Sequence, residues 1–210
     1  MKKFIVATRN NGKLNEIKEI LSNFEYEVLS MTDVGISREV EESGTTFKEN
    51  ALIKAKAVWE ITGETVMADD SGLEVDALNG APGIYSSRFA GINATDGDRN
   101  KKLLDLLKGV PFDKRKARFV CAIAVVYPDG SNFVVEGVCE GYIAFAPEGD
   151  NGFGYDPLFY IPEVGMTTAQ MEPEKKHCIS HRGKALKKMI NKLKQDSFKA
   201  EEVKNENTGT

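Results

Sequence analysis

Residues 3–30, KFIVATRNNGKLNEIKEILSNFEYEVLS, decide the fold class of this chain. The stretch opens with a short apolar run at residues 3–8, which is typical of a buried strand. A polar loop leads into residues 14–21, where apolar side chains recur at helical spacing, and residues 26–30 form a second strand-like run. A strand, a helix and a strand in succession favour parallel pairing, so this opening predicts an α/β protein.

The rest of the chain extends this pattern of strands and helices. Thr46 and Glu49 have the spacing of a capping box, which predicts a helix from there to about Thr62. A buried strand is expected at residues 65–68, ending in Asp69-Asp70-Ser71-Gly72. The remaining expected elements are a helix at residues 98–108, a central strand at 119–127, a hairpin turn at Asp129-Gly130, one or two strands within 132–145 and a last helix at 182–194.

The domain organisation follows from what separates these elements. No clean linker divides the chain, so we expect a single domain over residues 1–194, with two lobes that share one sheet. Residues 195–210 are mostly polar, with Lys and Glu mixed, and predict a disordered tail.

The composition excludes several classes of protein. The chain has 210 residues, 41% of them hydrophobic, and its 28 Lys and Arg against 32 Asp and Glu give a net charge of −4. These values are ordinary for a globular protein, and the negative charge argues against one that coats nucleic acid. Its apolar runs are shorter than the ~18 residues of a membrane helix, and no secretion signal opens the chain. Three cysteines without a CxxC pair predict a cytoplasmic location.

The first candidate site is the loop Thr8-Arg9-Asn10-Asn11-Gly12-Lys13. It leads from a strand into a helix, and the free N–H groups and the dipole of a helix N-terminus attract phosphate. Lys13 adds a full positive charge. A plain turn with an exposed lysine explains the same residues equally well, and the GxxxxGK[ST] pattern of a Walker A motif is absent.

The second candidate is a group of carboxylates. Asp69 and Asp70 stand at the expected end of a buried strand, where α/β proteins place catalytic or metal-binding acids. Neighbouring residues of a strand point to opposite faces, so at most one of the two is expected to face a site. A structural Asx turn is the alternative. Glu41 and Glu42 offer further carboxylates, although taken alone they fit a solvated acidic loop better.

Two more segments complete a possible ligand site. Gly152-Phe153-Gly154-Tyr155-Asp156-Pro157 can bring backbone and an aromatic ring close to a flat ligand, unless it is a structural turn around a core phenylalanine. Residues 176–184 place cations at the start of a helix, where an anionic ligand would explain them, although a solvated basic face is the alternative. Carboxylates for a divalent cation, cations for phosphates and an aromatic ring for a base together predict a nucleotide site that uses Mg²⁺.

Six motifs, in the same order along the chain, resemble those of the inosine triphosphatase family, the dITP/XTP pyrophosphatases. They are TRNNGK at 8–13, SGTTFKENA at 43–51, ADDSGL at 68–73, GAPGIYSSR at 80–88, FGYDP at 153–157 and SHRG at 180–183. The resemblance covers residues 1 to about 194 and depends on all six motifs together.

The resemblance implies a Mg²⁺-dependent hydrolase. Its substrates would be the non-standard purine nucleoside triphosphates ITP, dITP and XTP, and its products a monophosphate and pyrophosphate, which cleanses the nucleotide pool. The resemblance also implies an elongated mixed β-sheet with flanking helices, two lobes around a central cleft, and a homodimer.

Residue roles come from the same resemblance. The metal ligands fall on Glu41 and Asp70, and the catalytic base also falls on Asp70. Glu42 and Asp69 stay open as alternative ligands, because neighbouring acids cannot be separated by sequence. The implied substrate-binding residues are Thr8, Arg9, Asn10, Asn11, Gly12, Lys13, Ser71, Phe153, Gly154, Tyr155, Asp156, Lys176, His181 and Arg182.

Two rival interpretations remain. One is a nucleotide pyrophosphatase of the related Maf type with another specificity, against which the SHRG and FGYD motifs argue. The other is a non-catalytic nucleotide-binding module, against which the joint presence of Asp70, Glu41 and Lys13 argues.

Overall fold

The computed structural model describes residues 2–9, 11–22, 26–37 and 40–207. Its strands are β1 (Lys2–Val6), β2 (Tyr26–Ser30), β3 (Thr65–Val75), β4 (Lys116–Val126), β5 (Asn132–Ile143), β6 (Phe159–Ile161) and β7 (Met166–Thr167). Its α-helices are α1 (Asn11–Leu21), α2 (Phe47–Thr62), α3 (Asp96–Leu106), α4 (Pro173–Ile179) and α5 (His181–Asn207).

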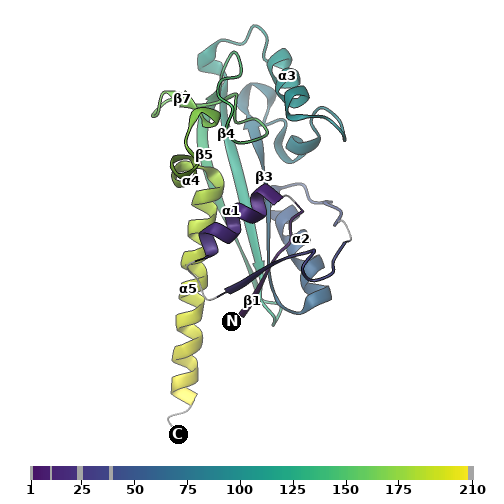
Figure 1. Ribbon diagram of the computed structural model, residues 1–210, viewed down its shortest axis with the longest axis vertical. Helices are drawn as coiled ribbons and strands as arrows, with labels where there is room; N and C mark the ends of the chain where they lie inside the picture. Colours follow the sequence, from purple (N-terminus) through teal and green to yellow (C-terminus); the bar gives the residue numbers. More distant parts are fainter. Residues whose placement is uncertain (1, 10, 23–25, 38–39, 208–210) are drawn as a thin grey trace.

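The strands form one mixed seven-stranded sheet in the order β2-β1-β3-β4-β5-β6-β7. β1 pairs in parallel with β2 and with β3, whereas the later pairs are antiparallel. The long strands β3, β4 and β5 run along the molecule, with β1 near one end and β7 near the other (Figure 1). The predictions of an α/β fold, of parallel pairing at its start and of an elongated mixed sheet are confirmed.

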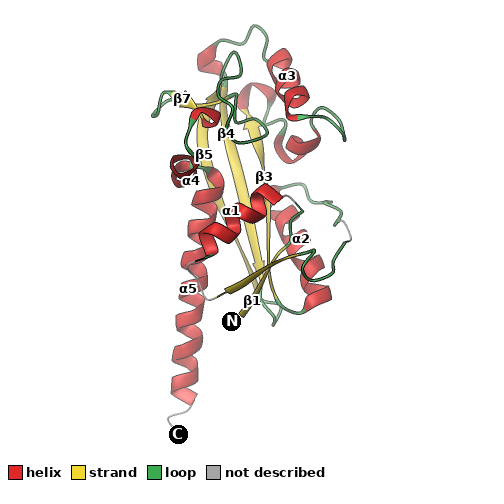
Figure 2. Cartoon of the chain, viewed as in Figure 1, coloured by secondary structure: helices red, strands yellow, loops and turns green. Residues whose placement is uncertain are grey.

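Helices cover both faces of the sheet at the β1 end (Figure 2). α2 packs on β3 and β4 over a core that contains Ala55, and α1 and α5 cover the other face over a core that contains Leu186. A third core, which contains Leu103 of α3, fills the opposite end beneath β6 and β7. The central strands therefore connect two separately packed ends of the molecule.

Strand β3 is longer than the sequence predicts. It does not end at Asp69 but continues to Val75, because it pairs with β4 along its length. At Gly72 a Cβ atom would lie 2.5 Å from two oxygen atoms of the 3-10 turn η2 (Gly83–Arg88). The missing side chain at Gly72 lets this turn pack against the strand. Because β3 continues to Val75, Asp69 and Asp70 are mid-strand residues.

The hairpin turn at Asp129-Gly130 is confirmed, and Gly130 adopts the positive φ of 82° that glycine tolerates. The segment after it, predicted to hold one or two strands, forms the single strand β5. The uninterrupted antiparallel pairing of β5 with β4 accounts for its length.

The C-terminal helix also differs from the prediction. It was expected to end near Lys194 before a disordered tail, but α5 continues to Asn207. Asp196 accepts hydrogen bonds from Tyr127 Oη and from Lys192 Nζ, both at 2.9 Å, which tie this turn to the end of β4 and to the preceding turn. Apolar spacing located only the part of the helix that lies on the core. In the described part of the chain no helix, α5 included, is long and apolar enough to cross a membrane.

Gly137→Ala is expected to lower the free energy of unfolding. A Cβ atom at Gly137 would lie 2.1 Å from His181 O and 2.5 Å from Ala185 N, so α5 would have to move away from β5. Overpacking of this kind costs roughly 1–3 kcal/mol, which urea unfolding measures. Gly97→Ala in α3 is the control, because the nearest atom to its added Cβ is 3.6 Å away. Equal stability of Gly137→Ala and the wild type would contradict this close packing.

Candidate active site

A cavity of about 590 Å³ opens where β1 stops pairing with β3. The last contact between the two strands is the hydrogen bond from Ala7 N to Met67 O, beyond which β1 leaves the edge of β3. The first turns of α1, α3 and α5, the middle of α2, the last turn of α4 and the loop at residues 153–156 supply further walls. The volume is within the range of small-molecule and cofactor sites.

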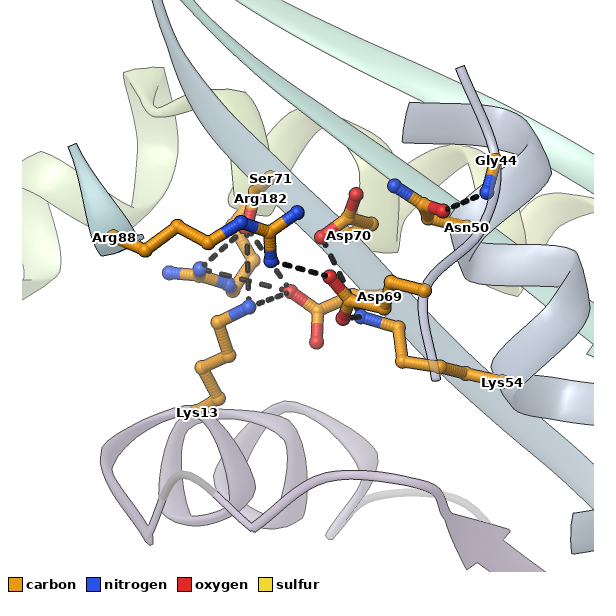
Figure 3. A network of polar contacts seen from close by, with 10 residues as sticks. Lys13, Gly44, Asn50, Lys54, Asp69, Asp70, Ser71, Arg88 and Arg182 are labelled. Atoms are coloured by element: carbon orange, nitrogen blue, oxygen red, sulfur yellow. Dashed lines mark hydrogen bonds and ion pairs between the residues drawn. The ribbon is translucent and has the colours of Figure 1, made fainter. Parts of the chain in front are cut away.

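Asp69 is the centre of a group of cations at this cavity (Figure 3). Its Oδ2 lies 2.7 Å from Lys13 Nζ and 3.7 Å from Arg182 Nη2, and it accepts a hydrogen bond from Ser71 Oγ at 3.2 Å. Ser71 Oγ accepts in turn from both cations, each at 3.2 Å. Burial raises the pKa of Asp69, but Lys13, Arg182 and Lys54 together hold that pKa well below its usual value. Asp69 is therefore the ionised counter-ion that Lys13 and Arg182 share.

Asp70 belongs to a second charged group on the α2 side of β3 (Figure 3). Lys54 Nζ lies 2.8 Å from Glu42 Oε1 and 3.4 Å from Asp70 Oδ1, so one ammonium joins two carboxylates. Asp70 Oδ2 is buried without a hydrogen bond, although the Asn50 amide lies nearby. Burial raises the pKa of Asp70, Lys54 lowers it by less, and Glu42 raises it further, so the carboxyl has a pKa above its usual value. A raised pKa suits a carboxylate that accepts a proton near neutral pH.

Both neighbouring acids line the cavity, which corrects the prediction that at most one would do so. The alternation along β3 holds, because Asp69 contacts α1 and α5 on one face while Asp70 contacts α2 on the other. The cavity reaches both faces because it wraps around the free edge of the strand. The alternation of side chains separates two adjacent residues into different sites only where the strand pairs with other strands on both edges.

The aromatic end of the cavity is built around Phe153. Phe153 is 46% exposed, and its ring faces two cations, with Lys176 Nζ 5.4 Å and Arg182 Cζ 5.8 Å from the ring centroid. Asp156 holds this loop, because its Oδ2 accepts from Phe153 N at 2.9 Å and from Lys176 Nζ at 2.6 Å. Its Oδ1 accepts from Thr168 Oγ1 at 2.8 Å. An exposed ring on a fixed loop can stack on a flat ligand.

His181 forms part of the wall between the two ends. Its buried ring stacks on Phe119, with centroids 4.7 Å apart and planes at 14°. Burial lowers the pKa of His181 well below its usual value, and nearby cations, Arg182 first among them, lower it further. His181 is therefore neutral at pH 7, with one ring nitrogen as a donor and the other as an acceptor.

The free energy of unfolding is expected to fall as the pH drops below about 6.5, the ordinary pKa of histidine. The unfolded chain then binds a proton at residue 181 that the folded chain excludes, which costs at most about 1.4 kcal/mol per pH unit. Urea unfolding of the wild type and of His181→Gln between pH 7.5 and 5.5 measures this. The free energy of unfolding of the variant should depend less steeply on pH than that of the wild type. Equal pH dependence of the two proteins would contradict a neutral, buried His181.

Most of the predicted site residues meet at this cavity. Those that line it are Thr8, Arg9, Lys13, Asp70, Ser71, Phe153, Gly154, Tyr155, Asp156, Lys176, His181 and Arg182. Asn10 lies outside the described residues, as does the side chain of Asn11, and Gly12 follows in the first turn of α1. Glu41 is exposed and is not one of the lining residues that the structure describes, whereas Glu42 is.

One predicted placement is wrong. Lys176 lies in the last turn of α4 and not at the start of α5, because a short helix that the sequence did not indicate precedes Ser180. Its ammonium nevertheless reaches the cavity through Asp156. Cations from two different helices, and not one basic helix start, therefore face the aromatic end.

Three charged lining residues are not among those that the sequence predicts. Lys54 lies in α2 beside apolar neighbours, and Asp96 and Arg99 come from α3. Asn50 and Lys54 are four residues apart on an otherwise apolar face of α2, and this polar spacing was the available signal. For Asp96 and Arg99 no local pattern distinguished them from a solvated first turn.

The acids at β3 fit a divalent cation. Asp70 Oδ2 is a buried carboxylate oxygen without a hydrogen bond, and Glu42 shares Lys54 with Asp70. Within the described residues no group of three or more His, Cys, Asp or Glu side chains converges as a metal site. Mg²⁺ commonly takes only one or two protein carboxylates and completes its shell with water and substrate phosphates. The residues therefore suit a Mg²⁺ ion whose shell needs the nucleotide.

The fold and the cavity define an α/β protein with a cleft that is acidic and cationic at one end and aromatic at the other. A profile of the Ham1 family matches residues 4–192, and this chain belongs to the Ham1 family.

Relatives and solved structures agree with this assignment. The chain is 54% identical over 188 residues to a dITP/XTP pyrophosphatase of Desulforamulus reducens, covering 90% of this chain and 94% of the relative. It is 51% identical to one from Clostridium perfringens, covering 92% of this chain and 98% of the relative. The solved structure of the Staphylococcus aureus Ham1 protein is 43% identical with a TM-score of 0.86, covering 93% of this chain and all of that one (100%).

Proposed function

We propose that this protein is a dITP/XTP pyrophosphatase that hydrolyses ITP, dITP and XTP to the monophosphate and pyrophosphate with Mg²⁺. The observation that carries the proposal is a single cavity that joins the two acid–cation groups of Asp69 and Asp70 to the exposed ring of Phe153. A nucleoside triphosphate has the matching parts, namely a polyanionic chain and a flat base. The names of the relatives support the same substrate class.

The triphosphate binds at the start of α1. The N-terminal backbone of that helix and Lys13 attract anions, and Lys13 already lies at the cavity edge beside Asp69. Phosphate oxygens would take over the contacts that Lys13 and Arg182 now make with Asp69 and Ser71. Positive charge held in this position stabilises the charge that develops as pyrophosphate leaves.

Asp70 is the proposed base and a metal ligand. Its raised pKa and its buried, unbonded Oδ2 suit an atom that orients a water molecule and accepts its proton. Mg²⁺ bound by Asp70 and an acid of the 41–42 pair would neutralise charge on the phosphates. Glu42 is the acid beside Asp70 in the structure, whereas Glu41, the one that the family resemblance implies, would have to turn inward.

The purine binds at the aromatic end. Phe153 can stack on the base, while Arg182, neutral His181 or backbone N–H groups can donate to the O6 acceptor of hypoxanthine or xanthine. Adenine carries an amino group at that position, so these buried donors would stay unpaired and ATP would be disfavoured. Guanine also carries O6, so the same donors can pair with GTP.

ITP is expected to yield pyrophosphate, not orthophosphate, as its first product, and only with Mg²⁺ present. With the purine at Phe153, the α-phosphate would lie among the acids and cations of Asp69 and Asp70. Attack of water on the α-phosphorus releases pyrophosphate. Products from ITP, XTP, GTP, ATP and pyrimidine triphosphates would be separated by ion-exchange chromatography without added pyrophosphatase.

The same panel separates the rivals. Orthophosphate as the first product would contradict attack at the α-phosphorus. A preference for pyrimidine or modified nucleotides would favour the Maf type, and binding without turnover would favour a non-catalytic module.

Assembly and location form a further part of the proposal. We expect a cytoplasmic homodimer, as the family resemblance and the reduced cysteines imply. Sedimentation equilibrium of the purified protein tests the dimer, and a single species of monomer mass would contradict it.

A further inference from the structure

Helix α3, whose first turn lines the cavity, holds the loop that carries Phe153. The N–H of Gly154 donates to Asp96 Oδ2 at 2.7 Å, and the C=O of Gly154 accepts from Asn100 Nδ2 at 3.0 Å. Asp96 and Asn100 are four residues apart and therefore project from one face of α3. Both backbone polar groups of a single glycine are thus bound by one helix.

The loop depends on such contacts because its own backbone is permissive. Gly152 and Gly154, on either side of Phe153, adopt positive φ values of 80° and 63°. Glycines in this region lose much conformational freedom when they are ordered. Asp156 binds the N–H of Phe153 from one side, and α3 binds Gly154 from the other. The direction of the exposed Phe153 ring therefore depends on both anchors.

The α3 anchor is itself firmly placed. Thr95 and Asp98 form a capping box at the start of the helix, and Asn100 is only 7% exposed. Asp96 pairs through its Oδ1 with Arg99. Burial raises the pKa of Asp96, but the Gly154 N–H and Arg99 lower it more, so Asp96 is ionised and its bond to Gly154 is charge-assisted.

We propose that Asp96 and Asn100 are positioning residues for the purine, because they fix Gly154 and thereby the Phe153 ring against the base. The inference rests on the proposed function, since it assigns a role at the purine end of the same cavity. The contacts of Asp96 and Asn100 with Gly154 are separate from the contacts of Lys13 and Asp70 at the phosphate end. Loss of either residue should therefore weaken recognition of the base and spare recognition of the phosphates.

The test compares Asp96→Ala and Asn100→Ala with Asp98→Ala. Asp98 is the matched control, because its carboxylate caps α3 through Thr95 without contacting the loop. Three quantities are measured for each variant: the ratio of kcat/KM for ITP over ATP, the affinity for IMP, and the affinity for inorganic tripolyphosphate. Calorimetry gives both affinities without turnover.

Both test variants should lower the ITP over ATP ratio and the IMP affinity by up to about tenfold, the upper part of the range for one hydrogen bond, and leave tripolyphosphate affinity within about twofold. Asp98→Ala should lower stability without changing the ratio. An unchanged ratio in both test variants, or an equal loss in Asp98→Ala, would overturn the positioning role. A wild type that does not prefer ITP over ATP would instead reject the proposed function. Asp96→Ala alone can decide the matter if Asn100→Ala does not fold, because the Asp96 side chain is 44% exposed.

Discussion

Asp70→Asn is expected to lower kcat for ITP by roughly a thousandfold, the middle of the range for loss of an acid–base group. The amide keeps the shape of the side chain but can neither accept the proton of water nor bind Mg²⁺ as a carboxylate does. The loss should appear in kcat and in kcat/KM together, because the interaction belongs to the transition state. Steady-state release of pyrophosphate at saturating Mg²⁺ measures it.

The same substitution is expected not to lower stability. The pKa of Asp70 is higher in the folded state than in the unfolded chain. At pH values above the unfolded pKa, the ionised carboxylate therefore lowers the free energy of unfolding, and an amide removes that cost. Lys54 keeps Glu42 as a partner at 2.8 Å. Glu74→Gln, on the same strand but paired with Arg118 at the surface, is the control and should leave kcat unchanged. Near-normal turnover of folded Asp70→Asn would reject the role of Asp70 and favour Asp69.

Patterns that depend on neighbours in sequence predicted the fold well. The capping residue Thr46 indicated the start of α2, and in the structure its Oγ1 accepts from Glu49 N at 3.1 Å. The strand–helix–strand opening gave the parallel pair of β1 and β2. Apolar spacing failed where tertiary contacts decide, as in α5 beyond Lys194, where Asp196 bonds to Tyr127. Periodicity records the core face of a helix and not its full length.

The site was harder to derive, because its geometry depends on where strands stop. The two carboxylates of β3 face one cavity only because β1 ends beside Met67 and leaves an edge free. Lys54 lies on the otherwise apolar face of α2, and its role is visible only once α2 is packed beside Asp70. The sequence motifs predicted residues at both the phosphate end and the purine end of the site. The side chains that hold those motifs in place, such as Asn100 at Gly154, are visible only in the structure.

Arg182→Ala and Lys13→Ala are expected to damage opposite ends of the substrate. Arg182 lies over the Phe153 ring, so its loss should lower the ratio of kcat/KM for ITP over ATP about tenfold or more. Lys13 stands in the first turn of α1, so its loss should lower kcat/KM for ITP, XTP, GTP and ATP alike, by up to about a hundredfold, and leave the ratio nearly unchanged. All four nucleotides would be assayed at saturating Mg²⁺.

The effects of the two variants are coupled, because Lys13 and Arg182 share Asp69 and Ser71 as partners. When one cation is removed, the other remains beside the ionised Asp69 and is held more tightly by it, so a small effect at the opposite end is expected from each variant. Lys18→Ala on α1 and Lys184→Ala on α5 are the matched controls, since Lys18 pairs with Asp33 and Lys184 Nζ binds Val138 O, away from the cavity. If Lys13→Ala collapses the ITP over ATP ratio while Arg182→Ala preserves it, the assignment of phosphate and purine ends is reversed. If both variants lower the ratio equally, Asp69 couples the ends so strongly that they act as one site.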